Sequence, residues 1–163
     1  EERLSQFLWQ SGNRYFLVDQ DGTVIRQIEE EEIQSMVNPP SLYGPVREGE
    51  SLENARALVY FVDASEHAPN IGQVVLSPQE IANVIGFKKQ LFKQGIVTVV
   101  FEMNRETGSW IRATTRQGFD ILFDPVASVD RQVENLRVVL AQQADPSVLE
   151  YIDLRFEDHI YVK

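Results

Sequence analysis

The sequence has no cysteine, only two histidines and a shortage of basic residues. The absence of Cys excludes disulfides, thiolate catalysis and Cys-based zinc sites. The 163 residues carry 15 Lys+Arg against 25 Asp+Glu, a formal net charge of −10. A protein this acidic is poorly suited to bind nucleic acid or an anionic lipid surface, because both ligands require a basic face. No apolar run approaches the roughly 20 residues of a membrane span, and no signal-peptide pattern is present.

Motifs that carry enzymatic or metal chemistry are also missing from the sequence. There is no Gly-x-Ser-x-Gly, no phosphate-binding loop, no dinucleotide-binding Gly motif and no His-Glu-x-x-His. Asp19-Gln20-Asp21-Gly22 is similar to part of a calcium loop, but Thr23 and Val24 do not supply the next ligands. We therefore predict a plain hairpin turn at Asp19–Gly22, with no metal and no cofactor.

Short apolar segments separated by turns predict many strands and two helices. Ser77-Pro78-Gln79-Glu80 is the clearest helix start, because Ser caps the first turn, Pro needs no donor there and Glu80 completes a capping box. A second amphipathic helix is predicted from Ser128. The predicted strands cover residues 7–9, 15–18, 23–25, 58–62, 96–103, 110–115, 119–123, 151–156 and 159–163.

The predicted strands outnumber the helices and are joined as hairpins rather than as βαβ units. We therefore expect an α+β fold, with a mixed, largely antiparallel sheet and two amphipathic helices packed on one face. The segment 38–55 contains Pro39-Pro40, Gly44, Pro45 and Gly49, and this composition is typical of a loop. The chain begins with Glu1 rather than Met, and we expect it to be a single domain, residues 1–163, excised from a longer protein.

Several side chains admit both a structural and a functional interpretation. The acidic run Glu29–Glu32 is expected to form a solvated strand end or loop, although it could bind cations or a basic partner. Trp9 and Trp110 lie in strand-like segments, where packing is favoured over sugar stacking. Lys88, Lys89 and Lys93 fall near the end of the first helix, where their charge complements the helix dipole.

The C-terminal segment offers a different kind of site. Ile152, Leu154 and Phe156 alternate with Asp153 and Arg155, as expected for a strand with one solvated face. A strand this late in the chain is expected near the edge of the sheet. An edge strand exposes unpaired backbone groups that are either guarded against aggregation or used to recruit an extended partner, and the residues alone leave both interpretations open.

The segments Tyr15–Gly22 and Tyr151–Lys163, near the two ends of the chain, resemble parts of the β domain of FtsQ/DivIB bacterial cell-division proteins. The opening Tyr15-Phe16-Leu17-Val18-Asp19-Gln20-Asp21-Gly22 is similar to the Tyr-Leu-Val-Asp-x-x-Gly hairpin of the family. The segment from Tyr151-Ile152-Asp153-Leu154-Arg155-Phe156 to Lys163 is similar to its Ile-Asp-Leu-Arg-Phe-x-Asp-x-Val-x-Val-Lys close. Between them, residues 131–140 resemble its Leu-x-x-Leu-x-x-Val-Leu helix.

The resemblance implies a non-enzymatic scaffold of the divisome that acts in septum formation. Members of the family have a cytoplasmic tail, one membrane helix, a POTRA domain and this β domain on the extracytoplasmic side. The parent protein is then anchored in the cytoplasmic membrane through a segment absent from this chain. In the family, the last strands bind FtsB, alongside FtsL, by strand addition. Carried over by position, Arg155, Phe156 and Asp158 are partner-binding residues. Tyr161 joins them as an aromatic on the recruiting strand.

Two further functions are compatible with the sequence. The chain could be an extracytoplasmic protein-interaction domain of another envelope or secretion system. It could also be a small hydrolase with a cleft lined by acidic residues and His67. Neither function implies a nucleic-acid partner, and only the hydrolase implies a small-molecule substrate.

Overall fold

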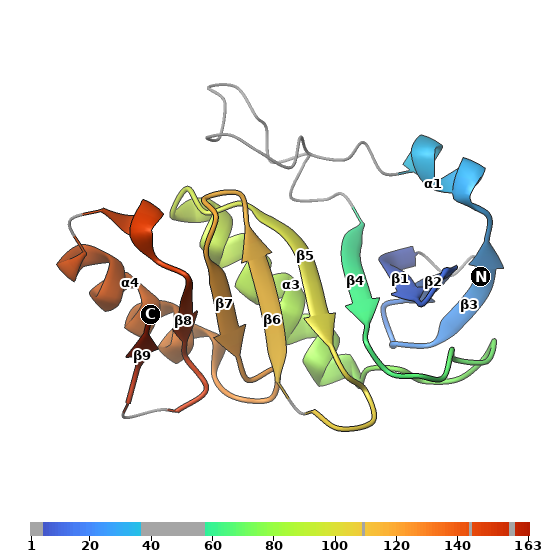
Figure 1. Ribbon diagram of the computed structural model, residues 1–163. Coiled ribbons are helices and arrows are strands. Elements are labelled where there is room, and N and C mark those ends of the chain that lie inside the picture. The colour runs from blue at the N-terminus through green and yellow to red at the C-terminus, as the bar shows by residue number, and fades with distance from the viewer. Residues whose placement is uncertain (1–4, 37–57, 109, 144, 157–158) are drawn as a thin grey trace.

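The computed structural model describes residues 5–36, 58–108, 110–143, 145–156 and 159–163, and its strands form one continuous sheet (Figure 1). The strand order across the described residues is β3-β2-β1-β4-β5-β6-β7-β8-β9. The strands are β1 (Ser5–Ser11), β2 (Arg14–Asp19), β3 (Val24–Ile28), β4 (Val59–Asp63), β5 (Thr98–Met103), β6 (Ile111–Thr115), β7 (Asp120–Phe123), β8 (Tyr151–Asp153) and β9 (Tyr161–Val162). The predicted loop 38–55 lies outside the described residues. The predicted strands are present with shifted ends, and β8 ends three residues earlier than predicted.

The sheet is mixed and largely antiparallel, as the sequence predicts. Parallel pairs occur between β1 and β4, between β4 and β5, and between β7 and β8. The expectation of hairpins without βαβ units is wrong in two places. Helix α3 (Pro78–Lys93) connects the parallel strands β4 and β5, and helix α4 (Val129–Gln142) connects the parallel strands β7 and β8. Parallel neighbours need such a crossover because a tight turn only joins antiparallel strands.

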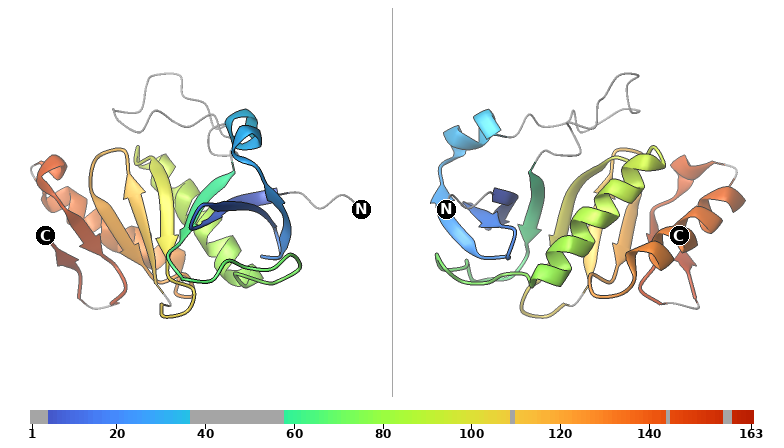
Figure 2. Two further views of the ribbon diagram at one scale, coloured as in Figure 1. Left: turned by 45° about the vertical axis from the view of Figure 1, so that its right-hand side comes forward. Right: turned by 180° about the vertical axis from the view of Figure 1, so that it is seen from behind.

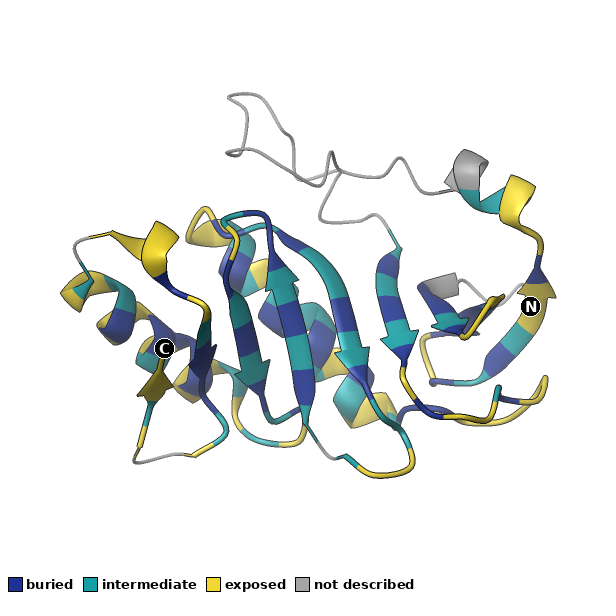
Figure 3. Cartoon of the chain, in the orientation of Figure 1, coloured by how far each residue is buried: buried dark blue, intermediate teal, exposed yellow. Residues whose placement is uncertain are grey.

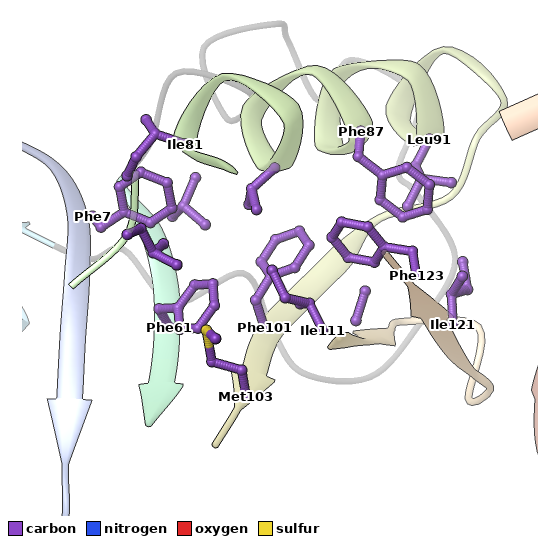
Figure 4. Packing of buried hydrophobic residues seen from close by; sticks show 14 of the residues in the cluster. Phe7, Phe61, Ile81, Phe87, Leu91, Phe101, Met103, Ile111, Ile121 and Phe123 are labelled. Atoms are coloured by element: carbon purple, nitrogen blue, oxygen red, sulfur yellow. The ribbon is translucent and has the colours of Figure 1, made fainter. Parts of the chain in front are cut away.

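Helices α3 and α4 lie on the same face of the sheet, as predicted (Figure 2). The capping box of α3 is formed: the Ser77 side chain accepts from the Glu80 N–H at 3.3 Å, and the Glu80 carboxylate accepts from the Ser77 N–H at 2.7 Å. Apolar residues of α3 point onto the sheet, where Phe87 stacks on Phe123 with ring centroids 4.1 Å apart (Figure 4). Each fully buried Phe contributes about 1.5–3 kcal/mol to folding, so this interface anchors the C-terminal strands.

The acidic run differs from its prediction, because it begins a short helix, α1 (Glu30–Met36), rather than a loop. Its acidic residues fall in the first turn, where they suit the positive end of the helix dipole. Glu32 also pairs with Arg26 at 2.9 Å. Ile33 of this helix packs against a small cluster on the face opposite α3, formed by Leu8, Leu17 and Ile28.

The segment 72–75 covers the start of the edge strand β3. The N–H of Val24 donates to the Gln73 carbonyl at 2.9 Å, and the N–H of Val75 donates to the Gly22 carbonyl at 2.8 Å. Gly22 has φ +79°, and a Cβ at this position would lie 1.8 Å from the Leu76 carbonyl oxygen. Glycine is therefore required where the covering segment crosses the hairpin turn.

Candidate functional site

Strand β9 lies at the outer end of the sheet (Figure 3). The segment around Asp153 and Arg155, for which an edge position is predicted, instead forms β8, which lies between β7 and β9. Lys163 and Tyr151 exchange two backbone hydrogen bonds of 3.2 Å, which fixes the phase of the β8–β9 ladder. Val162 is one residue away and faces Ile152. In an antiparallel ladder, residues alternate between pairs that exchange hydrogen bonds and pairs that do not. The N–H and C=O of Val162 therefore point away from β8, toward the side where no further described strand lies.

The end of β8 differs from the prediction, because the strand stops at Asp153 rather than Phe156. The Oδ1 of Asp153 accepts from the backbone N–H of Arg155 at 3.1 Å, which closes a turn instead of continuing the ladder. The same carboxylate accepts from Arg155 Nε at 2.8 Å and from Arg155 Nη2 at 2.6 Å. These hydrogen bonds raise the pKa of Arg155, whose side chain is only 28% exposed.

The structure brings together Arg155, Phe156 and Tyr161 and adds Trp110 to them. The Cζ of Arg155 lies 5.1 Å from the ring centroid of Trp110 and 5.3 Å from that of Phe156. The rings of Phe156 and Tyr161 meet edge to face, with centroids 5.7 Å apart. We call these four residues the arginine–aromatic cluster.

The arginine–aromatic cluster is accessible at the C-terminal end of the sheet. Phe156 is 49% exposed and Tyr161 54%, and the neighbouring Val162 is 39% exposed. Large apolar side chains exposed side by side are typical of a surface that another protein covers. Asp158, the remaining predicted site residue, lies outside the described residues.

Sequence reasoning did not assign Trp110 to this site. The two tryptophans are distinguished by their surroundings. Trp9 is fully buried and stacks on Phe61 with centroids 4.7 Å apart, so the packing interpretation is confirmed for it. Trp110 precedes β6 and contacts arginines on the surface instead. Its proximity to Arg155 depends on β6 and β8 flanking the same strand, β7, which no local pattern in the sequence reveals.

The structure places His67 away from the arginine–aromatic cluster, on the loop after β4. Its Nδ1 lies 2.7 Å from Glu106 Oε1, and its side chain is 78% exposed. Among the described residues, no group of three His, Cys, Asp or Glu side chains is arranged to hold a metal ion. The predicted turn at Asp19 is confirmed, because its Oδ1 accepts from the N–H groups of Asp21 and Thr23 at 2.9 Å.

Lys88, Lys93 and Lys163 lie outside the arginine–aromatic cluster, and their contacts are with the fold itself. Burial lowers the pKa of Lys88, and Lys93 lies in the last turn of α3. Lys163 Nζ lies 2.9 Å from Glu150 Oε2, and this contact raises the pKa of Lys163. The Lys163–Glu150 pair thus adds a side-chain link between β9 and the residue preceding β8. Within the described part of the chain, no helix is both long and apolar enough to cross a membrane.

Comparison with known proteins identifies the family of the chain. No curated protein matches the chain. The family model described as "Cell division protein FtsQ/DivIB, C-terminal" matches residues 7–155. The match runs from the first core strand to Arg155 and ends one residue before Phe156. It covers more than half of the sequence and includes both helices that pack on the sheet. The chain therefore belongs to the FtsQ/DivIB family of cell-division proteins and carries their C-terminal, extracytoplasmic domain.

Proposed function

We propose that this domain is a non-enzymatic scaffold that recruits FtsB, alongside FtsL, to the division site by strand addition at β9. The observation that carries this proposal is the position of β9 at the end of the sheet, with the backbone groups of Val162 directed outward. An extended partner that pairs with these groups would gain affinity from main-chain hydrogen bonds and specificity from neighbouring side chains.

The two ends of the sheet differ, and the difference favours recruitment of a partner at β9 over protection of that edge against aggregation. At the opposite end, segment 72–75 covers part of β3 and hydrogen-bonds to its backbone. At β9, the exposed large hydrophobic side chains are Phe156, Tyr161 and Val162, and Lys163 is exposed beside them. Natural sheets usually protect an edge with charges, proline or a covering segment. An edge flanked by aromatic side chains is more consistent with a partner-binding surface, where such residues dominate the binding energy.

The family match favours a role in cell division over a role in secretion or in hydrolysis. A domain of another secretion system would share the edge geometry but not the family match. The family is that of a scaffold-type domain rather than a known enzyme family. The partner-binding assignment of Arg155, Phe156, Asp158 and Tyr161 is part of this proposal, as is the membrane anchor of the parent protein.

The test is a backbone substitution, Val162→Pro, compared with Val162→Ala. Proline removes the outward N–H of Val162 without removing a donor from the β8–β9 ladder, and proline is tolerated at such positions of edge strands. The alanine variant loses the same side chain but keeps the N–H. Isothermal titration with the extracytoplasmic segment of FtsB should show much weaker binding for the proline variant than for the alanine variant. Equal affinities would exclude strand addition at this position.

A further inference from the structure

The guanidinium of Arg155 is surrounded by groups of its own chain. Asp153 accepts from its Nε and Nη2, while the rings of Trp110 and Phe156 lie within 5.1 and 5.3 Å of its Cζ. An exposed arginine normally samples many rotamers. Here the hydrogen bonds to a buried carboxylate fix the end of the side chain, and two rings restrict its sides.

Trp110 reaches Arg155 across the end of β7. Arg112 pairs with Leu122, and Leu122 pairs with Asp153. Continued by two residues beyond these pairs, the register places Trp110 and Arg155 on either side of Asp124, just past the last residue of β7. The contact between them therefore joins the β6 side of the sheet to the turn that leads into β9.

The orientation of the Phe156 ring depends on these contacts, because the side chain is half exposed and lies outside the hydrophobic core. Its ring contacts both Arg155 and Tyr161. A ring held in its binding orientation before the partner arrives loses less conformational freedom on binding, which strengthens affinity.

We infer that Trp110 is a positioning residue of the partner site, which holds Arg155 against Asp153 and thereby orients Phe156 beside the edge of β9. This inference rests on the proposed function, since it assigns to Trp110 a role in presenting that site. Tryptophan is suited to the role because its large ring gives the strongest attraction for a guanidinium among the aromatic side chains. Neither the family resemblance nor the sequence pattern assigned this residue to the site.

The test compares Trp110→Leu with the conservative variant Trp110→Phe in the full chain. Leucine keeps apolar bulk and removes the ring, whereas phenylalanine keeps a smaller ring. The first measurement needs no partner: the Arg155 Nε–Hε resonance is followed by NMR. We expect this resonance to move and broaden in Trp110→Leu and to be partly restored in Trp110→Phe. An unchanged resonance in Trp110→Leu would overturn the inference.

The second measurement is titration of both variants with the extracytoplasmic segment of FtsB. We expect Trp110→Leu to weaken binding about 2- to 5-fold, in keeping with the energy of a surface cation–π contact, and Trp110→Phe to recover most of the loss. Urea unfolding of the same samples shows whether the fold is intact, and loss of the fold in both variants would contradict a positioning role.

The two proposals fail in different ways. If Val162→Pro abolishes binding while Trp110→Leu leaves it unchanged, the role of Trp110 is wrong and strand addition stands. If wild-type protein does not bind the FtsB segment, the proposed function is wrong and the role assigned to Trp110 falls with it.

Discussion

Asp153 and Arg155 form an ion pair that also shapes the backbone. Oδ1 of Asp153 accepts from both the N–H and the Nε of Arg155, at 3.1 and 2.8 Å, while Oδ2 accepts from Nη2 at 2.6 Å. One carboxylate, 6% exposed, thus ends β8, neutralises the arginine and fixes the start of the turn toward β9. The pair links the stability of the domain to the geometry of its proposed binding edge.

The first prediction concerns this pair. Asp153→Asn keeps the side-chain size but leaves the partly buried guanidinium without its carboxylate. We expect the free energy of unfolding to fall by about 1.5–3 kcal/mol, as for hydrogen bonds to charged groups. Urea unfolding with an unchanged m-value measures the loss. The matched control is Glu134→Gln, which removes an equally short but exposed pair with Arg137 and should change stability little.

The second prediction concerns Phe156. Because its side chain is 49% exposed and outside the core, Phe156→Ala should leave the urea midpoint nearly unchanged. Binding to the FtsB segment should weaken by about 1–3 kcal/mol, in the range of interface aromatics. Ile71→Ala is the control, because Ile71 is also a large apolar side chain, 67% exposed, near the opposite end of the sheet. Similar affinities for the two variants, measured by calorimetry, would argue against Phe156 as a contact.

The third prediction concerns the covered edge at β3. Gly22→Ala places a Cβ against the Leu76 carbonyl and keeps φ positive, so both strain and a clash oppose folding. Gly12→Ala is the matched control, because Gly12 also has positive φ (+58°) but open space around it. We expect the control to lose about 1 kcal/mol of stability and Gly22→Ala to lose clearly more, as measured by thermal and urea unfolding. Equal losses of stability in the two variants would mean that the clash between the new Cβ at position 22 and the Leu76 carbonyl is relieved without an energetic cost.

The fourth prediction concerns pH. Partial burial, with a smaller contribution from Tyr15, raises the pKa of Tyr60 above its ordinary value, and its hydroxyl donates to Gln10 Oε1. Between the ordinary and the raised pKa, the unfolded chain has lost the proton that the folded chain retains, so stability falls as pH rises. One such group changes the free energy of unfolding by at most about 1.4 kcal/mol per pH unit.

Tyr60→Phe removes this titration. Urea unfolding at about pH 9 and about pH 11 should show a smaller decrease in the free energy of unfolding for the variant than for the wild type. Absorbance of tyrosinate in the folded state provides an independent check, because one late-titrating tyrosine should disappear in the variant. The same pH dependence in both proteins would contradict the assignment to Tyr60.

Local patterns in the sequence predict most of the fold. The capping box at Ser77–Glu80, the hairpin at Asp19–Gly22 and the alternation in the strands depend on near neighbours, so their signals are complete within a few residues. The acidic run at Glu29–Glu32 departs from its prediction because a tertiary contact, the packing of Ile33 against the cluster of Leu8, Leu17 and Ile28, favours a helix there. The end of β8 departs from its prediction because a side chain, Asp153, competes with the ladder for the Arg155 N–H.

The sequence by itself determined the class of the fold and the family. It also gave Arg155, Phe156 and Tyr161 as candidate partner-binding residues, because all three lie within one short C-terminal segment. Only the tertiary structure decided that β9 ends the sheet and that segment 72–75 covers part of the opposite edge. The order of the strands depends on where the connections through α3 and α4 return the chain to the sheet, and this is not encoded in any local pattern. It also brought Trp110 to Arg155 across 45 residues of chain, because the pairing of β6 and β8 with β7 places their ends side by side.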